Sequence, residues 1–165
     1  AKVSSWTRNY LNSFPAKGKI NGGYINSILA KLEALKCGYE EAIFLDADGY
    51  VAEGSGENIF WAKDNVIYTT PLPTVLRGIT RASIMKLAQE LGYQVVEKRA
   101  ARDELYLADE VWFCGTAAEI TPVREVDGHT IGQGHRGPIA QGLQDKFFAV
   151  VHGKEPAYEK WLTRV

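Results

Sequence analysis

Cysteine, histidine and long apolar runs are scarce in this sequence of 165 residues. The two cysteines, Cys37 and Cys114, stand in no CxxC or metal-ligand spacing, so we expect reduced thiols rather than a disulfide framework. The 3 histidines form neither a ligand pattern nor a catalytic triad, so no metal site and no triad hydrolase is predicted. No apolar run approaches the roughly 20 residues that a membrane-spanning helix needs.

An excess of either charge is also lacking. Lys and Arg number 19 against 20 Asp and Glu, which leaves a formal charge of -1, and the basic residues are scattered along the chain. A nucleic acid or an anionic membrane surface is therefore not predicted as a partner. The first ten residues have no apolar signal-peptide core, and we expect a cytoplasmic protein.

The residues that are present suit one ordinary globular core. Hydrophobic residues make up 45% and charged residues 24% of the chain, near the values of globular proteins. Helical spacing of apolar residues predicts helices over residues 22–38, 80–92, 102–108 and 138–151. Strands are predicted over residues 41–46, 50–53, 58–63, 66–70, 93–99, 110–115 and 119–127. Asp64 and Asn65 are predicted to form the hairpin turn between residues 58–63 and 66–70. Interspersed helices and strands without repeats predict an α/β or mixed α+β fold with a mixed sheet.

Four irregular segments border these elements and are richer in glycine and polar residues than turns require. Loops at element ends are common positions for binding sites, because a rigid scaffold holds their exposed backbone donors. For any one segment alone, a plain turn is the commoner explanation. The segments are KINGGY (19–24), EGSGEN (53–58), LRGIT (76–80) and CGTAAE (114–119).

Two of these segments have the makings of an anion site. In LRGIT, Gly78 permits close backbone approach, and the amides of Ile79 and Thr80 lie at the start of a predicted helix, where the dipole favours an anion. Thr80 is also a good N-cap for that helix. The successive amides of residues 115–117 follow a predicted buried strand and offer a second, weaker anion-binding concavity.

One further pattern, GxGxxG at residues 132–137, resembles a dinucleotide-binding loop. The residues before it are polar rather than a buried strand, and no βαβ unit follows. We therefore keep a dinucleotide-dependent oxidoreductase only as the weakest alternative.

Taken together and in order, four motifs resemble those of the class IV aminotransferases, pyridoxal-phosphate enzymes of fold type IV. The motifs are K-x-x-G-x-Y-x-N-S, E-G-S-G-E-N-I-F, R-G-I-T-R and G-T-A-A-E-I-T-P-V. Within the family they are most similar to the branched-chain amino-acid enzymes. The resemblance covers the whole chain and implies the large domain of the D-amino-acid aminotransferase-like fold, with a mixed sheet forming a partial barrel flanked by helices.

The resemblance also implies roles for single residues. Lys19 would be the catalytic lysine that binds pyridoxal 5'-phosphate as a Schiff base and moves the proton at the reacting carbon. Glu53 would face the pyridine nitrogen and keep it protonated. Tyr24 would hydrogen-bond the phenolic oxygen of the cofactor.

The remaining roles concern anions. Gly78, Ile79 and Thr80, together with Thr116, would hold the cofactor phosphate. Thr116 and Ala117 would meet the substrate carboxylate.

The family also implies a division of the chain. Residues 1–18 would be an interdomain linker or entering strand, residues 19–165 the cofactor-binding large domain, and a smaller N-terminal domain would be absent from this chain. Members are homodimers or higher homo-oligomers, and their partners are amino-acid and 2-oxo-acid substrates.

The function implied is transamination of branched-chain L-amino acids with 2-oxoglutarate. Two alternatives stay open: another fold type IV enzyme, acting on D-amino acids or on aminodeoxychorismate, and a catalytically incomplete cofactor-binding or dimerisation fragment. On its own, the fragment is expected to be inactive or weakly active.

Overall fold

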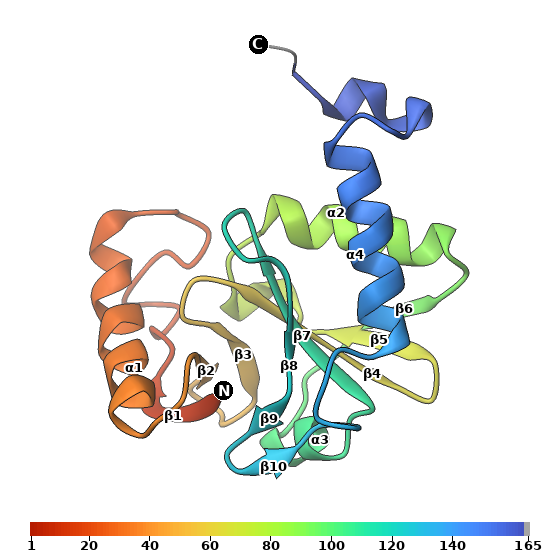
Figure 1. Ribbon diagram of the computed structural model, residues 1–165. Helices are drawn as coiled ribbons and strands as arrows, with labels where there is room; N and C mark the ends of the chain where they lie inside the picture. The colour runs from red at the N-terminus through yellow and green to blue at the C-terminus, as the bar shows by residue number, and fades with distance from the viewer. Residues whose placement is uncertain (164–165) are drawn as a thin grey trace.

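The computed structural model describes residues 1–163 and contains two mixed sheets flanked by helices (Figure 1). The last two residues of the predicted 19–165 domain lie outside the described residues. The smaller sheet has the order β1-β2-β3, with β1 parallel to β2 and β2 antiparallel to β3. Its strands are β1 (Lys2–Thr7), β2 (Ala42–Leu45) and β3 (Val51–Gly54).

The larger sheet has the order β6-β5-β4-β7-β8, and only β5 and β6 pair in parallel. Asp64 and Asn65 both have positive φ angles, which fits the predicted tight turn between β4 and β5. The two mixed sheets confirm the predicted fold class. The strands are β4 (Asn58–Lys63), β5 (Val66–Thr69), β6 (Gln94–Glu97), β7 (Glu110–Gly115) and β8 (Glu119–Val123), and β9 (Glu125–Val126) pairs with β10 (His129–Thr130) in a separate ribbon.

Helices form where the apolar spacing predicts them. The first ends at Lys36, two residues before Gly38, whose φ of +83° suits a glycine after a helix C-terminus. The second starts one residue earlier than predicted, so Gly78 rather than Thr80 is the N-cap. The α-helices are α1 (Tyr24–Lys36), α2 (Ile79–Glu90), α3 (Arg102–Tyr106) and α4 (Pro138–Val151); the 3-10 turns are η1 (Asn21–Gly23), η2 (Leu72–Thr74) and η3 (Pro156–Trp161).

Strand β4 lies at the centre of the core because both of its faces are buried. Phe60 and Ala62 pack with α2 and α4 on one face of the large sheet. Ile59 and Trp61 alternate with them and pack with residues of the small sheet, including Ile43. Figure 1 shows α1 against the small sheet and α2 and α4 against the large one. Within residues 1–163, no helix is both long and apolar enough to cross a lipid bilayer.

The glycines at residues 132–137 shape a turn and a helix cap. Gly132 and Gly134 have φ values of +54° and +75°, which favour glycine. A methyl group at Gly137 would overlap the side chain of Glu110 on β7. That carboxylate accepts hydrogen bonds from the amides of Ile139, at 2.9 Å, and Ala140, at 2.8 Å. Glu110 thus occupies the α4 N-terminus, where a dinucleotide pyrophosphate would have to bind.

We predict that Glu110→Gln lowers the free energy of unfolding by about 1–3 kcal/mol, because the amide nitrogen of glutamine cannot accept from a buried backbone N–H. Urea denaturation followed by circular dichroism measures the change. Glu40→Gln, at an exposed position, is the control. Equal stability of the two variants would contradict the capping role of Glu110.

Candidate active site

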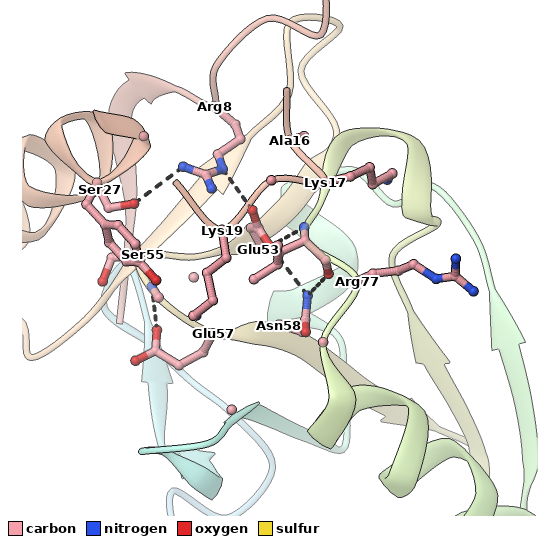
Figure 2. Close-up of a pocket in the computed structure, with 18 of the residues that line it drawn as sticks. Arg8, Ala16, Lys17, Lys19, Ser27, Glu53, Ser55, Glu57, Asn58 and Arg77 are labelled. Atoms are coloured by element: carbon pink, nitrogen blue, oxygen red, sulfur yellow. Dashed lines mark hydrogen bonds and ion pairs between the residues drawn. The ribbon is translucent and has the colours of Figure 1, made fainter. Parts of the chain in front are cut away.

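A pocket of about 280 Å³ lies where the four glycine-rich segments converge. It opens between the start of α1, the start of α2 and the ends of β3 and β7 (Figure 2). Ala117 lies in the exposed β7–β8 turn beside this pocket but is not among its lining residues. The lining includes the other predicted site residues: Lys19, Tyr24, Glu53, Gly78, Ile79, Thr80 and Thr116.

The Glu53 carboxylate, near the end of β3, is only 3% exposed. Arg8 Nε donates to its Oε1 at 2.8 Å, and the Leu76 amide donates to its Oε2 at 3.0 Å. The amide group of Asn58 donates to Oε2 as well, at 3.4 Å. Burial raises the pKa of Glu53, and the positive charge of Arg8 opposes that rise. These donors stabilise a carboxylate that would otherwise be buried without partners.

Arg8 follows β1, within the residues 1–18 that were predicted to be an interdomain linker or entering strand, and no role was predicted for it. Its Nη1 donates to Ser27 Oγ at 3.3 Å and to Asn26 Oδ1 at 3.4 Å, both on α1. Its guanidinium carbon lies 5.2 Å from the centroid of the Phe44 ring on β2. The sequence indicated that Glu53, at the end of an apolar strand, needs a partner, but it did not indicate which residue supplies it.

Lys19 extends into the pocket between Glu53 and Glu57, as Figure 2 shows. Its Nζ lies 5.7 Å from the centroid of the Tyr24 ring, the residue that opens α1. Across residues 1–163, its ammonium has no hydrogen-bond or ion-pair partner. The amine is therefore available to a ligand.

Lys17 is a second lysine in the pocket wall, and its amine is already engaged. Its Nζ donates to the carbonyl oxygen of Val75 at 3.1 Å. Partial burial lowers the pKa of Lys17, and the carboxylate of Glu53 opposes that shift. Of the two lysines, Lys19 is thus the one with a free amine directed at the pocket.

The start of α2 forms an anion cradle. Gly78 is the N-cap with extended backbone angles, and no side chain of the described residues caps the helix. A methyl group at Gly78 would overlap Oδ1 of Asn58, so glycine is required there. The amides of Ile79 and Thr80 in the first turn are therefore left for a ligand.

The opposite wall is the end of β7, where Gly115 and Thr116 follow Cys114. Burial raises the pKa of the Cys114 thiol to about 12, so the thiol stays protonated at neutral pH and is not a nucleophile. The pocket thus combines one free amine, one buried carboxylate and two sets of backbone amides. Such a set suits a ligand with a carbonyl carbon, a basic nitrogen and an anionic group.

Comparison with known proteins identifies the family. The family model described as "Amino-transferase class IV" matches residues 1–126. The chain belongs to the class IV aminotransferases. It is 54% identical over 164 residues to the branched-chain-amino-acid aminotransferase of Pseudomonas aeruginosa, covering 99% of this chain and 53% of that protein. It is 48% identical over 166 residues to the one of Escherichia coli K12, covering 100% of this chain and 54% of that protein.

Solved structures of this family have the same fold. The branched-chain aminotransferase of the archaeon Thermoproteus uzoniensis with norvaline has a TM-score of 0.94 and 47% identity, over 98% of this chain and 54% of that one. The holo-form of the enzyme from Thermobaculum terrenum has a TM-score of 0.96 and 41% identity, over 98% and 53%. The chain therefore spans about half the length of the relatives it matches.

The ion pair in this class IV aminotransferase site leads to a prediction. In Arg8→Met, the pKa of Glu53 should rise further above its ordinary value of 4.5, because the opposing positive charge is removed. Titration of ¹³C-labelled glutamate side chains by NMR measures that pKa, and Arg124→Met, at an exposed position, is the control.

The same shift has a consequence for stability. A carboxyl group whose pKa is raised on folding contributes stability below its unfolded pKa and loses that contribution as pH rises through its folded pKa. The stability deficit of Arg8→Met should therefore grow as pH increases above about 4.5. An unchanged Glu53 titration would contradict the role given to Arg8.

Proposed function

We propose that the full-length protein containing this chain catalyses pyridoxal-phosphate-dependent transamination between branched-chain L-amino acids (leucine, isoleucine, valine) and 2-oxoglutarate. The observation that carries the proposal is the meeting of a free lysine amine, a buried carboxylate and an amide cradle in one pocket. The similarity to relatives named as branched-chain-amino-acid aminotransferases supports the substrate class.

The donor set of the pocket fits pyridoxal 5'-phosphate. Lys19 supplies the primary amine for covalent attachment, and the buried Glu53 carboxylate suits a protonated ring nitrogen. Tyr24, within the same pocket, suits the phenolic oxygen. When bound, the cofactor supplies an electron sink for the carbanion formed at the substrate Cα. Related structures solved with pyridoxamine 5'-phosphate and with N-(5'-phosphopyridoxyl)-L-glutamate support this choice.

Backbone amides would bind the phosphate of the cofactor and the carboxylate of the substrate. Gly78, Ile79 and Thr80 at the α2 N-terminus, with Thr116 across the pocket, would hold the phosphate. Thr116 and the adjacent Ala117 would contact the substrate carboxylate. This arrangement explains how a chain with a net charge of -1 binds two anions without a basic face.

In this proposal, three residues of the chain have separate roles in the reaction. Lys19 Nζ takes the proton from the substrate Cα and returns a proton at C4′ of the cofactor. Glu53 holds a proton on the ring nitrogen. Arg8 opposes the rise in the pKa of Glu53 that burial causes, and so favours the ionised carboxylate that this task needs. We place this reaction in the cytoplasm, where the free thiols of Cys37 and Cys114 stay reduced.

Covalent labelling tests the site assignment. Incubating the full-length protein with pyridoxal phosphate, reducing with borohydride and mapping the labelled peptide by mass spectrometry should place the label on Lys19. Lys19→Ala should abolish labelling, whereas Lys17→Arg should retain it because the amine of Lys17 is bound to the Val75 carbonyl. A label on Lys17 would overturn the assignment.

The same preparation tests the substrate class. With 2-oxoglutarate as acceptor, leucine, isoleucine and valine should be the preferred amino donors. A preference for D-alanine, or turnover of aminodeoxychorismate, would favour another fold type IV enzyme. Labelled but inactive full-length protein would favour a cofactor-binding protein without catalysis.

We also infer that the full-length protein is a homodimer or a higher homo-oligomer, from the uncovered face of α1. Small residues of α1, including Ala30 and Ala34, face the small sheet. The large aliphatic residues lie on the opposite face, although their helical spacing resembles that of a core stripe. Ile25, Ile28, Leu32 and Leu35 are between 48% and 65% exposed. Apolar faces of this kind mark protein interfaces.

Ile28→Glu should therefore shift the full-length protein toward monomer, because a carboxylate in an apolar interface carries a desolvation cost. Analytical ultracentrifugation measures the distribution of species, and Gln89→Glu, at an exposed position on α2, is the control. A wild-type protein that sediments as a monomer would contradict the inference.

A further inference from the structure

Asn58, the first residue of β4, contacts two walls of the pocket at once. It is 5% exposed, and its Nδ2 donates to the carbonyl oxygen of Leu76 at 2.9 Å. The same nitrogen lies 3.4 Å from Oε2 of Glu53, to which it also donates. Figure 2 shows the Asn58 side chain between Glu53 and the segment that leads to α2.

The Leu76 peptide is held on both sides by this pair. Its N–H donates to Glu53 Oε2 at 3.0 Å, and its carbonyl oxygen accepts from Asn58. Gly78 N, two residues later, donates to the same carbonyl at 2.9 Å. The start of α2 is therefore tied to the Glu53 carboxylate through one peptide group.

Asn58 also contacts the N-cap of α2 and aligns the opposite wall. Its Oδ1 fills the space that a side chain at Gly78 would need. Its backbone is in register with Cys114 on β7, the strand that continues into Gly115 and Thr116. One buried residue thus connects the carboxylate and the start of α2 through its side chain, and the end of β7 through its backbone.

We propose that Asn58 is a positioning residue that sets the spacing between the Glu53 carboxylate and the anion-binding amides of α2. The inference rests on the proposed function, in which one rigid cofactor meets both groups through its ring nitrogen and its phosphate. Two anchors on one ligand act together only when their spacing matches that of the ligand. Among residues 1–163, the Asn58 side chain makes no hydrogen bond to the amine of Lys19 or to the amides of Ile79 and Thr80.

The test compares two ligands that differ only in the phosphate. Pyridoxal phosphate and pyridoxal are titrated against the full-length apoprotein. We define the phosphate gain as the dissociation constant of pyridoxal divided by that of pyridoxal phosphate. In Asn58→Ala, binding of pyridoxal phosphate should weaken about tenfold or more, whereas binding of pyridoxal should change by less than about threefold.

Asn58→Leu is the second variant because it keeps the branching at Cγ and the number of side-chain heavy atoms, and adds no charge that would itself repel phosphate. It should show the same loss of phosphate gain, so the test stands if Asn58→Ala does not fold. Asn12→Ala, at an exposed turn position, should leave both affinities unchanged. Thermal unfolding of each variant confirms that the proteins compared are folded.

The outcomes separate the two proposals. A phosphate gain that stays at the wild-type value in the folded variants overturns the positioning role, including the case in which both affinities weaken equally through a general loss of stability. Wild-type protein that binds neither ligand overturns the proposed function and the positioning role with it.

Discussion

Burial of the Glu53 carboxylate obliges the chain around it to provide donors, since an ionised carboxylate removed from water needs compensation. Those donors come from three separate parts of the sequence: Arg8 after β1, Leu76 before α2, and Asn58 on β4. Each donor draws its own segment toward the end of β3. Hydrogen bonds to this one side chain therefore connect three walls of the pocket.

The sheet arrangement makes this assembly possible. Strand β4 is buried on both faces, so the small sheet and the layer of α2 and α4 lie on opposite sides of it. The pocket lies at the edge where the ends of β3 and β7 meet the starts of α1 and α2. Helix starts supply free amides, and strand ends supply side chains held by a rigid sheet. An amine, a carboxylate and an anion cradle can then face one ligand.

Most secondary structure could be predicted from the sequence because its determinants are local. The spacing of apolar residues located α1 and α4, and the Asp64–Asn65 pair located the turn between β4 and β5. The four glycine-rich motifs pointed to residues of one pocket. Roles within that pocket, and the domain boundary at residue 18, remain predictions.

Other features could not be predicted because long-range pairing decides them. The bounds of strand β1 within residues 1–18 could not be predicted, since the strand forms by pairing with β2, about 40 positions away. Arg8 was missed for the same reason, because it stands 45 positions from Glu53. The aliphatic spacing of α1 looked like that of an ordinary buried face. In the structure it is the small residues that meet the sheet, where a close approach leaves no room for larger ones.

By itself the sequence determined the helices, most strands, the fold class and the motifs of a class IV aminotransferase. These depend on residue types at short spacing, which any window of the chain contains. Only the tertiary structure decided which of two neighbouring lysines has a free amine, which cation pairs with Glu53 and which face of α1 stays uncovered. Those outcomes follow from sheet register and packing, which bring distant segments within hydrogen-bond distance. Neither can be predicted from a single stretch of residues, because each depends on several segments at once.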